Sequence, residues 1–186
     1  MILFVGLGNP SPDNENNRHN IGFRIIDAIN QEFGLSKQKP KFKGLLTTGS
    51  IGNKKVYAIK PLTFMNNSGI CIRELIEYFK IDPENVIVFH DDLDVDFGKI
   101  KTKFGGSSAG HNGVESLDKF IGKDYSRVRI GIGKPSVKKN TPEHVLKDFD
   151  DEEKIELENM TKTITNSIAI LLDKKLDLFS STVNNK

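Results

Sequence analysis

Two short runs without a polar side chain constrain the fold more than any other feature of this sequence. Residues 2–7 read Ile-Leu-Phe-Val-Gly-Leu, and residues 86–89 read Val-Ile-Val-Phe. Half-buried strands alternate apolar and polar residues, whereas short, fully apolar runs are typical of central strands that are covered on both faces. The sequence therefore predicts a sheet whose two faces both pack against other elements.

Segments with helical periodicity can provide that cover. Apolar residues at positions 21, 25, 29 and 33 share one face of a predicted helix, and those at 72, 75, 76 and 79 mark a second helix that ends before Pro83. A third, short helix is predicted around Leu117. The pair Gly52-Asn53 lies between two apolar stretches, 45–51 and 56–59, so it predicts a hairpin and a mixed sheet.

The length of the chain suits one domain. With 186 residues, of which 37% are hydrophobic, the chain can bury one complete core. We predict an α/β fold in which a twisted, mixed and mostly parallel β-sheet carries helices on both faces. This single three-layer domain is expected to span residues 1–186, with only the tail at 184–186 frayed.

The last third of the sequence carries two further expectations. A long helix is predicted from about Asp151, where an acidic run suits a helix N-terminus. Its inward residues are expected to be Ile155, Met160, Ile164, Ile168 and Leu172. Before this helix, Gly131, Gly133 and Pro135 make mobility plausible near residues 134–146, and the sequence leaves open whether a lid there closes on a substrate.

Composition argues against several classes of protein. The one cysteine cannot form an internal disulfide, no apolar run approaches the ~20 residues of a membrane span, and the opening residues lack the basic flank of a signal peptide. We therefore expect a cytoplasmic protein with no membrane partner. A dinucleotide fingerprint fails at Ser11, a calcium loop fails at Phe97 and Lys103, and the histidines lack zinc-site spacing, so neither cofactor nor metal is expected.

The net charge of +2 hides an uneven distribution of charge along the chain. Lys99, Lys101 and Lys103 alternate with less polar residues along a predicted strand, so one face of that strand is cationic. A second predicted strand carries Arg127 and Arg129 in the same alternation. Local positive charge of this kind attracts a polyanion even when the net charge is small.

Polar side chains cluster just beyond the apolar runs. Because the carboxyl ends of parallel strands meet at one edge of a sheet, these clusters predict one shared crevice. A neutral imidazole can take a proton from water, and a carboxylate bonded to its other ring nitrogen stabilises the imidazolium that forms. His19 is the candidate base and Asp91 is its candidate partner. Asn9, Asn66 and Asn112 offer amide groups that can hold a peptide-like group and developing oxyanion charge.

A rival nucleophile lies in a glycine-rich loop. Residues 106–110 read Gly-Ser-Ser-Ala-Gly, which matches the nucleophile elbow of serine hydrolases and falls between a predicted strand and a predicted helix. Ser108 is therefore the candidate nucleophile of a serine esterase. Such short matches arise easily by chance in loops of glycine and serine, and we favour a flexible loop beside the crevice.

The polar clusters, read with their neighbours, resemble the bacterial peptidyl-tRNA hydrolases. The segments that carry the resemblance keep the order and approximate spacing of that family over nearly the whole chain, and several are too long for coincidence. They are Gly6-Leu7-Gly8-Asn9-Pro10, Arg18-His19-Asn20-Ile21-Gly22-Phe23, Lys60-Pro61-Leu62-Thr63-Phe64-Met65-Asn66-Asn67-Ser68-Gly69, His90-Asp91-Asp92-Leu93-Asp94, Gly110-His111-Asn112-Gly113 and Arg129-Ile130-Gly131-Ile132-Gly133.

The resemblance implies a monomeric enzyme of phosphorylase/hydrolase-like fold that needs no metal or cofactor. Its substrate would be peptidyl-tRNA, cleaved at the ester between the peptide and the terminal ribose so that the tRNA can be reused in translation. By the same resemblance His19 is the general base, Asp91 orients and stabilises it, and Asn9 distinguishes a blocked α-amino group from a free one.

The remaining site residues are also implied by the resemblance. Contacts with the peptidyl-adenosine end of the substrate are expected at Asn14, Phe64, Asn66, His111 and Asn112, with His111 acting through a bridging water. Lys103 and Arg129 correspond to a basic clamp on the 5′ phosphate of tRNA, which agrees with the cationic strand faces.

The sequence departs from the family pattern in the loop before His19. Ser11 replaces a glycine, Asn14 a tyrosine and Asn17 a threonine, so residue 14 offers no aromatic face to the terminal adenosine, although its backbone could still make contact. Glu115 stands where a basic residue is common, which predicts weaker binding of tRNA. A homologue that binds RNA without hydrolysis is a further alternative, and the presence of both the base and its acid argues against it.

Overall fold

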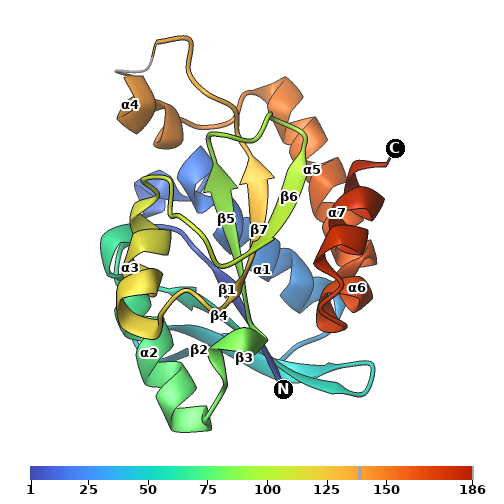
Figure 1. Ribbon diagram of the computed structural model, residues 1–186. Helices are drawn as coiled ribbons and strands as arrows, with labels where there is room; N and C mark the ends of the chain where they lie inside the picture. The colour runs from blue at the N-terminus through green and yellow to red at the C-terminus, as the bar shows by residue number, and fades with distance from the viewer. Residues whose placement is uncertain (138–139, 186) are drawn as a thin grey trace.

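One sheet of seven strands forms the centre of the molecule (Figure 1). The computed structural model describes residues 1–137 and 140–185. The strands lie in the order β2-β3-β4-β1-β5-β7-β6; the neighbours β4, β1, β5 and β7 pair in parallel, and the outer strands pair antiparallel. The mixed, mostly parallel sheet is thereby confirmed. The strands are β1 Ile2–Gly6, β2 Lys39–Lys41, β3 Gly44–Ile51, β4 Lys54–Pro61, β5 Val86–Asp92, β6 Ile100–Phe104 and β7 Ser126–Gly131.

The two apolar runs occupy the middle of this sheet, as the sequence predicts. β1 lies between β4 and β5, and every residue of β1 is buried. β5 continues past its apolar run to Asp92, so Asp91 belongs to the carboxyl end of a central strand. The predicted hairpin at residues 52–53 joins β3 and β4.

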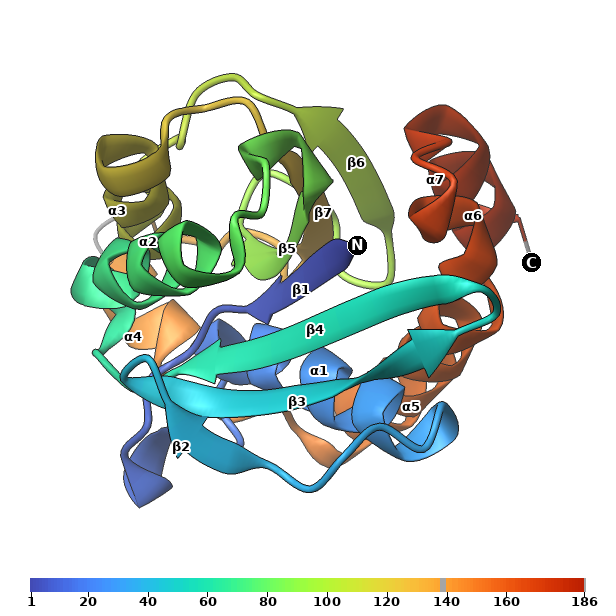
Figure 2. The same cartoon turned by 90° about the horizontal axis from the view of Figure 1, so that it is seen from below.

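Helices cover both faces of the sheet and complete the three layers. Helices α1 and α5–α7 pack on the face that carries Phe4 and Phe89, and α2 and α3 pack on the opposite face around Val5 and Val88. Figure 2 shows α2 and α3 on one side of the sheet and α6 and α7 on the other. The helices are α1 Ile21–Glu32, α2 Ser68–Phe79, α3 Asn112–Ile121, α4 Thr141–Val145, α5 Asp151–Asn166, α6 Ile168–Leu172 and α7 Leu176–Asn184.

The last long helix of the sequence prediction is in fact three helices. A capping box of Asp150 and Glu153 begins α5, and the chain turns near Ser167 before α6 and again before α7. The expectation that Ile155 faces inward is wrong, because its side chain is 67% exposed and Leu157 is buried instead. Ile155 and Met160 are five residues apart, which places them on different sides of a helix with 3.6 residues per turn.

Two other segments were singled out by the sequence. Segment 134–146 contains the short helix α4, which lies at one end of the sheet (Figure 1), while residues 138 and 139 of that segment lie outside the described residues. At the tail, Asn184 still belongs to α7, and its side chain bonds the backbone N–H and C=O of Ile100. The expectation that Asn184 is frayed is therefore wrong. Residue 186 also lies outside the described residues. Within the part of the chain that the structure describes, no helix combines the length and apolarity needed to span a bilayer.

Candidate active site

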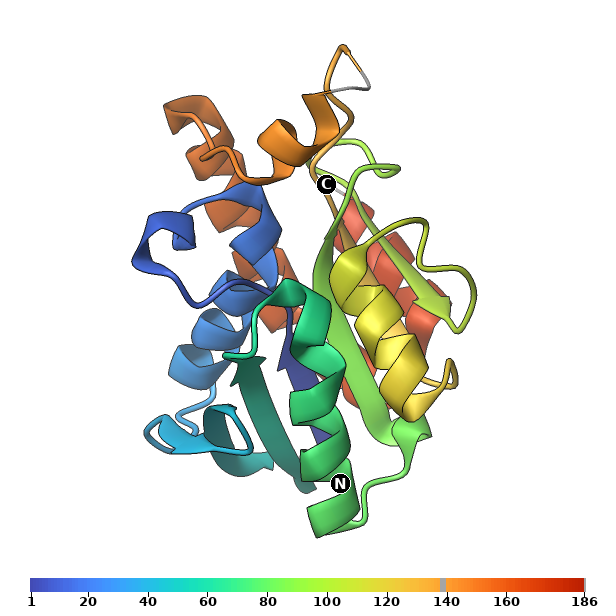
Figure 3. The same ribbon diagram turned by 90° about the vertical axis from the view of Figure 1, so that its left-hand side faces the viewer.

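A cleft of about 830 Å³ lies at the carboxyl ends of the central strands. Figure 3 shows that the segments following β1 and β4, the N-terminal end of α3 and helix α4 all approach this end of the sheet. The cleft collects the predicted site residues other than the two cationic ones. Those that line it are Asn9, Asn14, His19, Phe64, Asn66, Asp91, His111 and Asn112.

His19 is positioned by a helix that packs unusually close to the sheet. It lies in a 3-10 turn, Arg18–Asn20, directly before α1. A Cβ at Gly22 would come within 2.5 Å of the Leu7 backbone N and of the Phe89 backbone O, so only glycine permits this approach. The Arg18 guanidinium, bonded to two backbone carbonyls near the start of α5 and to Glu153, fixes the turn from the other side.

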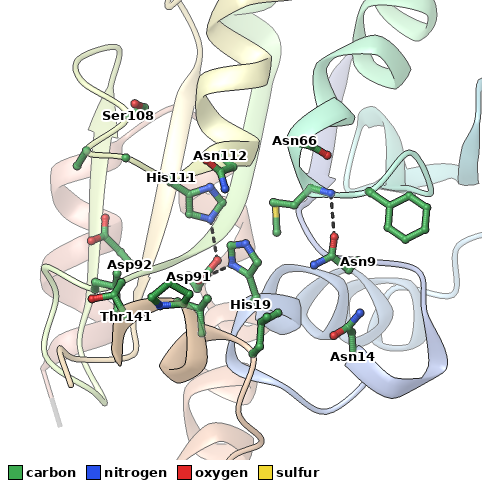
Figure 4. A pocket seen from close by; sticks show the side chains of 18 of the residues that line it. Asn9, Asn14, His19, Asn66, Asp91, Asp92, Ser108, His111, Asn112 and Thr141 are labelled. Atoms are coloured by element: carbon green, nitrogen blue, oxygen red, sulfur yellow. Dashed lines mark hydrogen bonds and ion pairs between the residues drawn. The ribbon is translucent and has the colours of Figure 1, made fainter. Parts of the chain in front are cut away.

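Asp91 lies between two imidazole rings (Figure 4). Its Oδ2 is 2.8 Å from Nδ1 of His19, and its Oδ1 is 2.7 Å from Nε2 of His111. All three side chains are largely buried, with 2% of the Asp91 side chain exposed and about a tenth of each imidazole. The Asp91 carboxylate of β5 therefore joins a side chain of the turn Arg18–Asn20 to the side chain of the residue before α3.

The hydrogen bonds assign opposite tautomers to the two histidines. Nδ1 of His111 accepts from the backbone N–H groups of Gly113 and Val114, so the proton of His111 is on Nε2, which donates to Asp91. His19 instead donates from Nδ1, because an ionised carboxylate can only accept. The lone pair of His19 is consequently on Nε2, which has no hydrogen-bond partner among the described residues.

The electrostatics of the site keep Asp91 ionised. Burial raises the pKa of Asp91. The positive charge that His111 and His19 carry when protonated, together with their hydrogen bonds, outweighs that effect and holds the pKa below the ordinary value of a carboxyl group. The neighbouring His90 has its own pKa lowered to about 3, first by burial and then by the charge of protonated His111. His90 is therefore a neutral, structural histidine that donates from Nδ1 to the Asp91 backbone O.

Asn9 presents one particular end of its amide to the cleft. Its backbone N and O are both bonded by the side-chain amide of Asn20, at 2.8 Å each. Its Oδ1 accepts from the backbone N–H of Met65 at 2.8 Å, which fixes the orientation of the amide. The Nδ2 group, without a partner in the described chain, is turned toward the side of His19 (Figure 4). Asn9 is therefore a rigidly held hydrogen-bond donor.

The other predicted contacts surround this centre. Phe64 has 55% of its side chain exposed and a φ of 63°, a left-handed conformation that is uncommon for a bulky residue and marks local strain. Asn66 follows it in the exposed turn η3, Met65–Asn67, and Asn112 is the exposed first residue of α3. Asn14 lines the cleft from the entry loop, where its Oδ1 accepts from Nδ2 of Asn17.

The two predicted cationic residues lie outside the cleft, on β6 and β7. Lys103 is exposed, whereas Arg129 bonds Asp92 through Nε at 2.8 Å. Burial raises the pKa of Asp92, but the hydrogen bond from Arg129 outweighs it and the pKa is lowered. Since Lys101 pairs opposite Arg129 in the antiparallel ladder, Lys103 and Arg129 share one face of the sheet edge. Arg127, predicted to be on a cationic face, is buried against the Gly105 carbonyl.

His111 has a direct role in the site that sequence reasoning missed. The resemblance expects it to act through a bridging water, whereas the structure places it as the second hydrogen-bond donor to Asp91. One sequence feature could have indicated this role. His111 directly precedes a predicted helix, where an acceptor side chain caps the first turn. Sequence reasoning also missed Asn20, whose role in holding Asn9 follows from no local pattern.

The same three side chains also have the composition of a metal site. Ligand atoms of His19, Asp91 and His111 lie within 4.8 Å of one another. The backbone contacts of His111 require a proton on its Nε2, however, and that nitrogen would need to lose it to bind a cation. The donor set fits a hydrogen-bonded base better than a metal. Ser108 lines the same cleft, half-buried, from the loop before His111.

Known proteins share this architecture. A family model described as "Peptidyl-tRNA hydrolase" matches residues 3–186. Peptidyl-tRNA hydrolase of Pelagibacter ubique (strain HTCC1062) is 79% identical over the full length of both chains, and that of Bartonella henselae is 42% identical over 99% of this chain and 95% of its own. The crystal structure of peptidyl-tRNA hydrolase from Acinetobacter baumannii superimposes with a TM-score of 0.93 at 32% identity, covering 100% of this chain and 95% of its own. The chain therefore belongs to the peptidyl-tRNA hydrolase family.

Proposed function

We propose that the protein hydrolyses the ester between the peptide and the terminal ribose of peptidyl-tRNA, with His19 as general base. Nε2 of His19 takes a proton from a water molecule as the water oxygen attacks the ester carbonyl. The proton then passes to the ribose oxygen as the ester bond breaks, giving free tRNA and a peptide carboxylic acid. The acid releases its remaining proton to solvent and becomes the carboxylate. The observation that carries the proposal is the hydrogen bond between Nδ1 of His19 and Asp91, which leaves Nε2 as the basic nitrogen.

Asp91 and His111 support this step without touching the substrate carbonyl. The carboxylate stabilises the imidazolium that forms on His19, and its second bond to His111 keeps it in place. Asn66 and Asn112 line the cleft, where their amides are suited to hold the ester and to donate to its oxygen as charge develops there. Phe64 offers an exposed aromatic ring to the terminal adenosine.

Asn9 supports selection of a blocked α-amino group. Since Met65 occupies its Oδ1, only the Nδ2 donor faces the substrate. A donor is matched by the carbonyl oxygen of the group that acylates the α-amino nitrogen. A free α-ammonium group offers only donors, so it would meet Asn9 unpaired. Aminoacyl-tRNA with a free amino group is thereby a poor substrate.

We further propose that the tRNA body lies over the edge strands. Lys103 and Arg129 are suited to bind a phosphate there, because they share one face of the sheet next to the cleft. The proposal includes a monomer that acts in the cytoplasm. Light scattering of the enzyme alone and with tRNA checks the stoichiometry, for which one enzyme per tRNA is expected.

The activity test uses tRNA that carries an N-acetylated amino acid. We expect His19→Ala to lower kcat/KM by roughly two to four orders of magnitude, the usual share of general base catalysis. Ser108→Ala should stay close to wild type, because no step uses its hydroxyl. A His19 variant as active as wild type would refute the assignment, complete dependence on Ser108 would identify a serine esterase, and binding without hydrolysis by wild type would identify an RNA-binding homologue.

A further inference from the structure

A second cavity adjoins the catalytic cleft at Asn9. It has a volume of about 480 Å³, within the range of ~300–1,000 Å³ typical of ligand sites. It is lined by loop residues 10–12, 15 and 16 and by residues of α1, β3 and β4. Asn9 lines both cavities, and the loop separates them, with Asn14 on the catalytic side and Glu15 on the other. A peptide bound at Asn9 in the cleft therefore lies at the boundary between the two cavities.

The orientation of the Asn9 amide determines which group of the substrate can bind to it. Its Nδ2 is the group available to a ligand, and under the proposed function this donor binds the carbonyl that blocks the α-amino nitrogen. In a peptide that carbonyl belongs to the residue before the esterified one. The main chain of the preceding residue is consequently at Asn9, on the boundary of the second cavity.

We propose that the second cavity binds the amino-acid residues that precede the esterified residue of peptidyl-tRNA. The inference rests on the proposed function and extends it, because it assigns a subsite for the peptide part of the substrate. An acetyl group ends at the carbonyl bound by Asn9 and cannot reach into this cavity. A peptide of several residues can occupy it, and the enzyme is thereby expected to bind longer peptides more tightly than an acetyl group.

The lining of the cavity fits a peptide better than a nucleic-acid backbone. Two cationic side chains, Arg24 and Lys60, are balanced by two anionic ones, Glu15 and Asp27. Lys60 and Asp27 neutralise each other in an ion pair of 2.6 Å. A phosphate site would need uncompensated positive charge. The aliphatic stem and ammonium group of Lys60 lie over the ring of Phe23, with Nζ 5.7 Å from its centroid, which makes an apolar floor with a polar edge.

Bulky side chains placed in the cavity test the proposal. Glu15→Trp and Ser11→Trp introduce a ring from the loop, at positions where the side chain lines the cavity and Ser11 makes no capping hydrogen bond. Asp13→Trp is the matched control, because this exposed acid of the same loop lines neither cavity and loses the same charge as Glu15. The natural chain has no tryptophan, so the emission of each variant reports the environment of the new ring alone.

Two substrates with the same tRNA separate the possible outcomes. The emission of Glu15→Trp and Ser11→Trp should be blue-shifted relative to that of Asp13→Trp, because their rings are in the cavity. With a tetrapeptidyl-tRNA, we expect both variants to raise KM at least about tenfold, with little change in kcat. With acetyl-aminoacyl-tRNA, KM should stay within about twofold of wild type. Unfolding temperatures close to wild type exclude misfolding as the cause.

The opposite results are equally distinct. A blue-shifted ring that leaves KM unchanged for both substrates would overturn the subsite. An equal rise in KM for both would also overturn it, because the cavity would then hold part of the tRNA end. A wild type that cleaves neither substrate would instead contradict the proposed function.

Discussion

Replacing Asp91 with asparagine tests the geometry of the site at its centre. The Asp91 carboxylate accepts two N–H groups, one from each imidazole. An amide has one acceptor atom and one donor group, so it can satisfy only one of them in the same way. His111 cannot change tautomer, because its Nδ1 accepts from the start of α3. The amide oxygen must therefore turn to His111, and its NH₂ group must face His19.

This orientation of the amide leaves the His19 side chain in place but makes it unable to act as a base. An NH₂ group beside Nδ1 of His19 selects the tautomer with its proton on Nε2, where the proposed mechanism needs a lone pair. The carboxylate charge that stabilises the imidazolium is lost as well, from a side chain that is only 2% exposed. The analogous change in a serine-protease triad lowers kcat about 10⁴-fold. We expect a loss of about 10³- to 10⁴-fold here, which is about 4–5.5 kcal/mol of transition-state stabilisation.

The assay is single-turnover and steady-state hydrolysis of N-acetyl-aminoacyl-tRNA at pH 7. We expect kcat to fall and KM to change little, because Asp91 is buried behind the two rings. The double variant Asp91→Asn/His111→Ala provides the control for the tautomer argument. Without His111 the new amide is free to turn its oxygen to His19, so the double variant should be no less active than Asp91→Asn alone. A single variant within about threefold of wild type would refute the reasoning.

Three further predictions follow from the surrounding contacts. His111→Ala should lower the free energy of unfolding by about 2–4 kcal/mol, because α3 loses its cap and the buried Asp91 carboxylate loses one of its two donors. In chemical denaturation, His111→Asn should restore the part that comes from the cap, about 1 kcal/mol. His90 has its pKa lowered to about 3 while the unfolded chain has about 6.5, so the unfolded state binds more protons between these values. The stability that neutral His90 contributes should thus be lost as the pH falls from 6.5 to 3, by up to about 1.4 kcal/mol per pH unit. In His90→Gln the free energy of unfolding should therefore depend less steeply on pH over this range. An unchanged slope would contradict a neutral His90. Lys103→Ala should raise KM with kcat almost unchanged and reduce the slope of log affinity against log salt by about one, whereas an unaltered slope would exclude a phosphate contact.

The fold was largely predictable because its signals are local. Two apolar runs became the central strands β1 and β5, and the turn pair at 52–53 became the hairpin of β3 and β4. The end of α5 was not predictable in the same way. The helical spacing of apolar residues continues past Ser167, from Ile164 to Ile168 and Leu172, and the break depends on how α6 and α7 pack against the sheet. Helix α4 contains Pro142 and has no buried residue, so no periodicity marks it.

The sequence predicted which residues line the site, but not the hydrogen bonds that join them. Strand exits and the family resemblance selected His19, Asp91 and the asparagines, and the cleft brings them together. The bonds that orient them join residues far apart in sequence, as with Asn9 and Met65 or Asp91 and His111. No spacing rule specifies such pairs, because they depend on tertiary packing. The departure at Asn14 similarly becomes interpretable only with its partner Asn17 in view.

The position of one proton tests the account most directly. In protein labelled with ¹⁵N at histidine, NMR at neutral pH distinguishes a protonated Nδ1 from a protonated Nε2 for each ring. The account predicts that His19 carries its proton on Nδ1 and His111 on Nε2, with both N–H groups shielded from exchange by their bond to Asp91. A His19 ring protonated on Nε2 and bare at Nδ1 would contradict the account, since the nitrogen assigned to deprotonate water would already be occupied.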